Sequence, residues 1–120
     1  YVQPRIEIED DYDKESITYM GMVQGKSGAS SWGKNYTWGG KLVENIVQAT
    51  ARDCLAVAML RLTQAGYNIV MHVHDEVILA MPYGVGSLKE AEEIMGKSIP
   101  WAPGLLLNAD GYETEYYKKD

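Results

Sequence analysis

The chain has 120 residues, a net charge of −6 and one cysteine. This length accommodates one hydrophobic core, so we expect a single domain or a piece of one and exclude several domains within the chain. No stretch approaches the ~18 consecutive apolar residues of a membrane-spanning helix, so we expect no membrane partner.

Net charge and cysteine content indicate which partners and which cellular compartment to expect. Phosphate contacts are normally made by clusters of Lys and Arg, so the net charge argues against nucleic-acid binding by the whole surface. Cys54 cannot form an internal disulfide, and its apolar neighbours favour a small core residue in a reducing, cytoplasmic setting. The chain opens Tyr-Val-Gln-Pro with neither an initiator Met nor a signal peptide, so we expect part of a longer protein.

Two strands and a loop are predicted in the first third of the chain. Residues 2–9 and 16–23 partly alternate apolar and polar side chains, as strands do. A solvated turn or strand edge is expected around six acidic residues: Glu7, Glu9, Asp10, Asp11, Asp13 and Glu15. Residues 24–40 are rich in Gly, Ser, Asn, Trp and Tyr, which is typical of a loop.

A long helix is predicted over residues 41–65, which contain no Pro or Gly, and Gly66 is expected to end it. An apolar stripe at steps of three and four must pack on another surface: Val43, Val47, Ala51, Cys54, Ala58 and Leu62. A polar stripe covers only the first half: Lys41, Asn45, Gln48 and Arg52. We therefore expect a helix that is half exposed and half buried.

A second, shorter helix is predicted over residues 87–97. Ser87 is placed to cap it, and Glu90 is placed to complete a capping box. Residues 105–117 favour a final extended segment, interrupted near 108–111.

Between the helices, residues 68–73 and 77–81 are short apolar runs that predict a β-hairpin. His72-Val-His74-Asp75-Glu76 places two imidazoles and two adjacent carboxylates at its tip. Mg²⁺ prefers carboxylate oxygens and bridges to phosphate, and adjacent strand residues face opposite ways, so one carboxylate would be the direct ligand. The spacing alone also fits a turn that favours Asp, with hydrogen-bonded histidines. A zinc site is the weaker alternative, because no second ligand pair appears.

Four segments carry a resemblance to a known family. They are Tyr36-Thr-Trp-Gly-Gly-Lys-Leu-Val-Glu-Asn-Ile-Val-Gln-Ala-Thr-Ala-Arg-Asp53, Ala65-Gly-Tyr67, Val73-His-Asp-Glu-Val77 and Pro100-Trp-Ala-Pro-Gly-Leu-Leu-Leu-Asn-Ala-Asp-Gly-Tyr112. Together they resemble the C-terminal end of DNA polymerase I family (family A) enzymes, nearest to the bacteriophage or prophage branch. The resemblance covers nearly the whole chain, and the combination is specific, whereas His-Asp-Glu alone would be weak.

The resemblance implies an α+β fold, part of a polymerase palm. Residues 1–120 would form a single domain in which an antiparallel sheet packs with helices and a long helix precedes the His-Asp-Glu hairpin. The implied activity is DNA-directed DNA polymerisation, with nucleotidyl transfer to a primer 3′-hydroxyl assisted by two Mg²⁺ ions. The implied partners are primer-template DNA, deoxynucleoside triphosphates and the upstream palm, fingers and thumb segments, in a bacterial or phage-infected cytoplasm.

By position, the resemblance assigns catalytic and metal-binding roles to Asp75 and Glu76. His74 would lie near the primer terminus, and Gln48 would touch the duplex minor groove. Asn45 and Arg52 are further DNA-binding candidates, although a plain solvated helix face is the favoured explanation for each of them. The family's other essential aspartate and its nucleotide-binding helix do not occur here, so we expect the chain alone to be inactive.

The chain also departs from the family pattern. Ala80 stands where the resembling enzymes often have an acidic residue, and Leu106 stands where they often have Pro, which would fit a diverged or relic copy. Trp32, Trp38 and Trp101 have the chemistry of base-stacking platforms, but we expect them to serve packing or loop anchoring.

Two other classes of function remain open. A non-catalytic relic or structural nucleic-acid-binding module would keep the palm core without its chemistry. A stand-alone metal-dependent phosphoesterase would use His72, His74, Asp75 and Glu76 and would act by itself. Apolar surface that normally meets the rest of an enzyme would also allow self-association.

Overall fold

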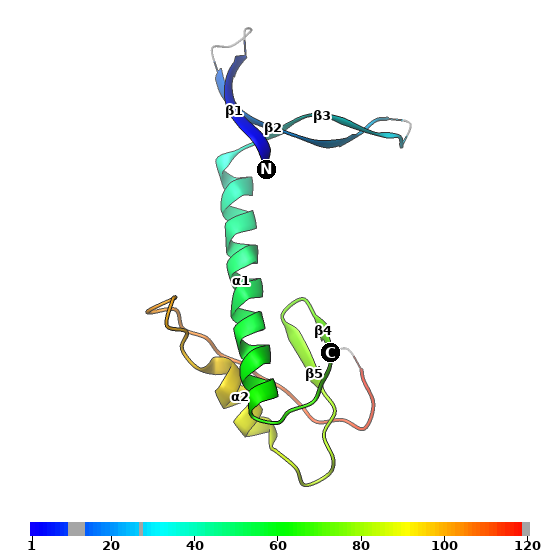
Figure 1. Ribbon diagram of the computed structural model, residues 1–120, viewed down its shortest axis with the longest axis vertical. Coiled ribbons are helices and arrows are strands. Elements are labelled where there is room, and N and C mark those ends of the chain that lie inside the picture. The colour runs from blue at the N-terminus through cyan, green and yellow to red at the C-terminus, as the bar shows by residue number, and fades with distance from the viewer. Residues whose placement is uncertain (10–13, 27, 119–120) are drawn as a thin grey trace. The chain divides into compact units, whose positions relative to one another are not determined.

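The computed structural model describes residues 1–9, 14–26 and 28–118. The chain forms a three-stranded antiparallel sheet, a long helix, a separate two-stranded hairpin and a short helix (Figure 1). It divides into two compact units, Tyr1–Val47 and Gln48–Asp120, and each is described by itself. Within the ranges just given, no helix combines the length and the apolar character needed to cross a bilayer.

The first unit is built on an antiparallel meander. β1 (Val2–Glu9), β2 (Lys14–Gln24) and β3 (Ser30–Thr37) pair in that order. β1 and β2 lie where strands were predicted. The acidic residues predicted to form the turn between them, Asp10, Asp11 and Asp13, lie outside the described residues.

The prediction of a loop over residues 24–40 was wrong, because β3 lies within it and pairs with β2 along its whole length. Glycine and serine content favoured a loop. The larger side chains of Trp32, Lys34 and Tyr36, however, recur at every second position, which is the period of a strand. Pairing with β2 then supplies the backbone hydrogen bonds that a loop would make to water.

The long helix α1 (Gly39–Gln64) matches the prediction and ends in a Schellman motif at the expected glycine. Gly66 has a φ of 91°, and its N–H donates to the carbonyl of Thr63 at 3.1 Å. The N–H of Tyr67 donates to the carbonyl of Leu62 at 3.0 Å. The side chains of Leu62 and Tyr67 are both buried in one hydrophobic cluster, so the cap and the core form together.

Only the last part of the predicted apolar stripe on α1 is buried within this chain. Ala58 and Leu62 are buried and Cys54 is half-buried. Val43 and Val47, in the first unit, are exposed. The stripe therefore finds a packing partner only where α1 enters the core of the second unit.

The second unit has its core at the end of α1. β4 (Ile69–Val73) and β5 (Glu76–Leu79) pair antiparallel, and α2 (Leu88–Gly96) follows them. Leu62 is fully buried, and Tyr67 and Ala91 join it. Partly buried residues surround this cluster: Ile69, Val77, Leu79, Met81, Ile94 and Met95. The cluster joins the root of the hairpin to residues of both helices.

One hydroxyl, that of Tyr67, connects the end of α1 to the start of α2. The Ser87 side chain caps α2 as predicted, accepting from the backbone N–H of Glu90 at 3.2 Å. The predicted capping box is not closed, because the Glu90 carboxylate accepts from the Tyr67 hydroxyl at 2.7 Å. The Ser87 N–H donates to the same hydroxyl at 3.1 Å. Tyr67 therefore stands where the Glu90 side chain would close the box.

Arg61 fixes the other end of α2. Its guanidinium donates to the carbonyl oxygens of Lys97 and Ser98, at 2.8 and 2.9 Å. Carbonyls at a helix C-terminus have no partner within the helix, so this fork satisfies acceptors that would otherwise need water. Residues at or just beyond the last turn of α1 thus hold α2 at both ends.

The predicted extended segment at residues 105–117 forms no strand. It lies against α2 instead. A Cβ on Gly111 would lie 2.9 Å from Leu88, and a Cβ on Gly96 would lie 3.5 Å from the carbonyl oxygen of Leu107. The Gly111 contact is too close for a side chain, and the Gly96 distance is ordinary van der Waals contact, so the segment lies against the helix.

Gly84 and Gly86 form a matched pair for testing the packing around Tyr67. Both have positive φ, 77° and 74°, so alanine is strained at either position. A Cβ on Gly86 would also lie 2.9 Å from the Tyr67 ring, whereas one on Gly84 meets nothing within 4 Å. We expect Gly84→Ala to lower the free energy of unfolding by about 1–2 kcal/mol and Gly86→Ala to lower it by more, measured by urea denaturation. Equal losses would contradict the close packing.

Removing the Tyr67 hydroxyl should weaken the second unit and alter its response to alkali. Tyr67→Phe leaves the Ser87 N–H and the Glu90 carboxylate without this partner, so we expect it to lower the free energy of unfolding. The hydrogen bond to Glu90 raises the Tyr67 pKa above its ordinary value of 10.0, although the bond to the Ser87 backbone opposes it. The folded protein holds this proton more tightly than the unfolded chain. The stabilisation is therefore complete below pH ~10 and is lost as the pH rises through the folded pKa.

Urea denaturation on both sides of pH ~10 would measure this dependence. Tyr83→Phe is the control, since Tyr83 is 92% exposed. Tyr67→Phe should remove part of the alkaline loss and Tyr83→Phe should not. The same alkaline loss in both variants would show that Tyr67 does not titrate as argued.

Candidate functional site

The residues of the predicted site meet in the turn between β4 and β5. Val73 pairs with Glu76, so His74 and Asp75 form a two-residue turn. Two-residue turns join antiparallel strands over the shortest distance. The turn and the first residue of β5 therefore place one imidazole and two carboxylates in three consecutive residues.

His74 adopts an unusual backbone conformation at this turn, with a φ of 54°. Two-residue hairpin turns need positive φ at their first position, which glycine adopts most readily. A residue with a side chain costs free energy there, and such residues concentrate at functional sites. The hairpin thus presents an imidazole at its tip where glycine would serve the turn better, which supports a role for the side chain beyond the turn.

The two carboxylates differ in exposure. Asp75 is exposed at the second turn position, and Glu76 is half-buried as the first residue of β5. His72 and His74 are both exposed. Carboxylate oxygens are the ligands that Mg²⁺ prefers, so the chemistry of Asp75 and Glu76 fits this ion.

The turn does not contain a complete metal site. Among the described residues, no three His, Cys, Asp or Glu side chains lie close enough together to hold a metal ion. A cation bound at Asp75 and Glu76 would therefore need further oxygen ligands from outside the turn.

The other predicted site residues lie on α1. Gln48 and Arg52 are exposed and one helical turn apart, on the part of α1 that belongs to the second unit. Asn45 belongs to the first unit, where its amide donates to the hydroxyl of Tyr1. Asn45 thus has a structural contact within its own unit. DNA binding by Asn45, Gln48 and Arg52 stays a prediction.

The three tryptophans are more exposed than expected. Exposed fractions are 60% for Trp32, 69% for Trp38 and 53% for Trp101. The Trp38 ring fills the space where a Cβ on Gly40 would lie, so this ring packs against the start of α1. Trp32 stands on β3, where a loop was predicted. The alternation of Trp32 with other large side chains is the signal that could have revealed it.

The chain is similar in sequence to two phage proteins. It is 54% identical over all of its 120 residues to a DNA polymerase of Bacillus phage SP02. It is 34% identical over 59 residues, 49% of the chain, to a DNA-directed DNA polymerase of Pseudomonas phage M6. The matches span 18% and 8% of those two proteins. No protein-family model and no solved structure matches the chain. The chain is therefore similar throughout to a segment of a phage DNA polymerase.

Replacing His74 by glycine tests whether the His74 side chain lowers the stability of the turn. Because φ is positive, His74→Gly should leave the free energy of unfolding unchanged or raise it by up to about 1 kcal/mol. His72→Gly is the matched control, since His72 lies within β4, where glycine should cost about 1 kcal/mol. Urea denaturation of both variants measures the difference. Destabilisation by His74→Gly equal to that by His72→Gly would contradict the strain argument.

Proposed function

We propose that this chain is the part of a family A DNA polymerase that carries the His-Asp-Glu hairpin of the palm. The complete enzyme would transfer nucleotides from deoxynucleoside triphosphates to the 3′-hydroxyl of a primer paired with a DNA template. The observation that carries the proposal is the similarity to the Bacillus phage SP02 DNA polymerase along the whole chain. The exposed turn at His74 and Asp75 supports it, because a triphosphate must be able to reach the Asp75 carboxylate.

Asp75 and Glu76 are the residues that would hold Mg²⁺, an ion that neutralises phosphate charge and favours the ionised 3′-hydroxyl when bound. Asp75 is exposed at the tip, so its oxygens are free to meet a metal–triphosphate complex. Glu76 is half-buried in β5, which restricts its motion and suits a supporting role. Two carboxylates do not complete a two-metal site. We therefore infer that this chain needs the other palm carboxylate, together with the fingers and thumb, to be active.

The remaining predicted residues suit contacts with duplex DNA of any sequence. The amide of Gln48 can donate to the purine N3 and pyrimidine O2 acceptors that every base pair presents in the minor groove. Arg52 can bind a phosphate, which positions DNA without reading its sequence. His74 can donate a hydrogen bond at the primer end from the tip of the hairpin. A polymerase needs such contacts because it copies every sequence.

A chimeric enzyme tests the proposal. This chain would replace the matching segment of the Bacillus phage SP02 DNA polymerase, and primer extension would be measured with Mg²⁺ and all four nucleotides. We expect the chimera to extend the primer, and the 120-residue chain alone to be inactive. Asp75→Ala in the chimera should reduce extension by about 10³-fold or more, because it removes a ligand of the ions that stabilise the transition state.

Glu93→Ala is the matched control, since it removes an exposed carboxylate from α2 and should leave extension unchanged. Full extension by the Asp75→Ala chimera would refute the assigned role. An inactive chimera that folds and still binds primer-template DNA would favour the non-catalytic relic.

A further inference from the structure

The sheet of the first unit presents a row of side chains that the proposed polymerase chemistry does not use. Along β3, the residues opposite Met22, Met20 and Thr18 of β2 are Trp32, Lys34 and Tyr36, respectively. Paired residues, and every second residue along a strand, lie on the same face of a sheet. Trp32, Lys34 and Tyr36 therefore form one row, here called the aromatic row.

The aromatic row is open to solvent. Trp32 is 60% exposed and Tyr36 is 61% exposed, and 46% of the Lys34 side chain is exposed between them. Aromatic side chains dominate burial in cores and interfaces, and exposed groups of them mark binding surfaces. Two exposed rings with a cation between them form such a group.

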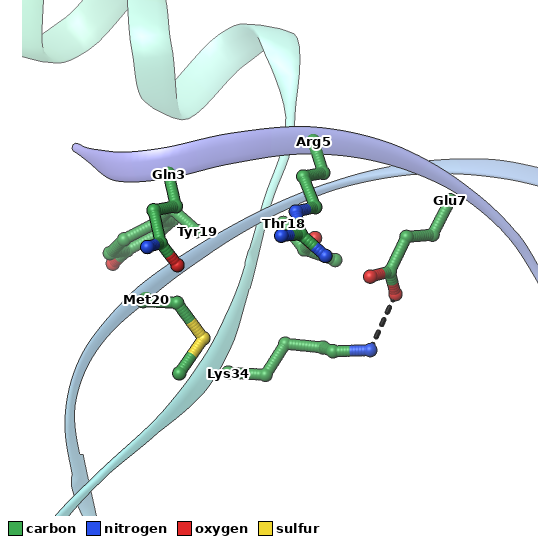
Figure 2. A pocket seen from close by; sticks show the side chains of 7 residues that line it. All are labelled: Gln3, Arg5, Glu7, Thr18, Tyr19, Met20 and Lys34. Atoms are coloured by element: carbon green, nitrogen blue, oxygen red, sulfur yellow. Dashed lines mark hydrogen bonds and ion pairs between the residues drawn. The ribbon is translucent and has the colours of Figure 1, made fainter.

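Positive charge lies on the same face, although the chain as a whole is acidic. Arg5 of β1 stands opposite Thr18, which stands opposite Tyr36, so Arg5 shares the face with Lys34 (Figure 2). The Lys34 ammonium lies 2.6 Å from the carboxylate of Glu7, and this hydrogen bond raises the Lys34 pKa. Lys34 therefore stays charged at neutral pH, and Glu7 holds it in place.

The row ends at an open hollow of about 330 Å³ beside Trp32, lined also by Tyr1, Tyr19 and Met20. The rings of Tyr1 and Tyr19 meet edge to face, with centroids 4.8 Å apart. The amide of Asn45 donates to the Tyr1 hydroxyl and fixes that ring further. Walls that are ordered before a ligand arrives reduce the entropy lost on binding.

We propose that this face binds single-stranded DNA, with bases stacked on Trp32 and Tyr36 and phosphates next to Lys34 and Arg5. Side chains two positions apart on a strand lie about 6.6–6.8 Å apart along it, so the cation stands between two stacking platforms. Stacking tolerates every base, because each has a π-face. Duplex DNA keeps those faces covered, so the row selects the unpaired strand. The inference rests on the proposed function, which makes that strand part of the primer-template.

A packed protein segment fits this face less well. It would take Arg5 and the Lys34–Glu7 pair out of water, and desolvating such charges costs more than a pair usually returns. A DNA strand supplies negative charge and leaves the side chains partly hydrated, as is usual at nucleic-acid interfaces.

The test is fluorescence anisotropy of a labelled oligo-thymidine with the 120-residue chain. Trp32→Leu keeps an apolar side chain but removes the ring, and should weaken binding about 5- to 150-fold. Trp32→Phe keeps a ring and should retain most of the affinity. Trp101→Leu is the matched control, because Trp101 is 53% exposed in the other unit, and it should bind like the parent. Circular dichroism verifies that each variant is folded.

Charge variants test the same face independently. Lys34→Met should weaken binding and reduce the slope of log K against log salt concentration by about 0.7, the value for one phosphate contact on a single strand. Glu7→Gln should tighten binding, because it removes a carboxylate that competes with phosphate for Lys34. If the Lys34–Glu7 pair served only to hold the sheet together, Glu7→Gln would weaken binding.

The proposal is overturned if the folded parent chain does not bind the oligonucleotide at low salt, or if Trp32→Leu binds as well as Trp101→Leu. It is also overturned if Trp32→Leu instead weakens assembly of the chain with the other polymerase segments. Primer extension by the chimera separates this proposal from the polymerase function. Asp75→Ala should abolish primer extension and leave the oligonucleotide affinity unchanged. Trp32→Leu should lower the oligonucleotide affinity and leave extension at saturating primer-template unchanged.

Discussion

The second unit depends on the Tyr67 side chain more than on any other single group. Its ring is buried with Leu62 where the Schellman motif ends α1, and its hydroxyl binds the Ser87 N–H and the Glu90 carboxylate at the start of α2. β4 begins two residues after Tyr67. One side chain therefore fixes the exit of the long helix, the entry of the short helix and the root of the hairpin, so a change at Tyr67 would be felt at the hairpin tip.

These contacts of Tyr67 explain how the exposed turn between β4 and β5 can still be well positioned. The root of the hairpin packs in the core, whereas His74 and Asp75 lie at the far end with no packing of their own to order them. A two-residue turn compensates, because it leaves few conformations to the residues it contains. Under the proposed function, the positive φ at His74 is a local strain that keeps an imidazole next to the carboxylates of Asp75 and Glu76.

The sequence was sufficient to predict the structural features that depend on neighbouring residues alone. The ends of α1 and α2 depend on Gly66 and Ser87, whose conformational preferences act within one helical turn. The sequence could not indicate that Tyr67 would displace Glu90 from the capping box, because those two residues are 23 positions apart and meet only after folding. β3 was not predicted for a different reason. The Gly and Ser content of residues 24–40 favours a loop, whereas large side chains at every second position of β3 favour a strand. The site residues came from the family resemblance. Spacing alone left the hairpin carboxylates open to a structural explanation.

The exposure of α1 bears on how the chain would work in a polymerase. An isolated helix gains little stability from propensity alone, and most helices in proteins are held by packing of an apolar face. Val43, Ile46 and Val47 carry such a face, and all three are exposed. Under the proposed function, other segments of the polymerase would pack there and order the part of the helix that leads to Gln48. The hairpin carboxylates would then gain their missing partners through the same packing that orders the DNA-contacting face of α1, so catalysis and DNA binding would both depend on one assembly step.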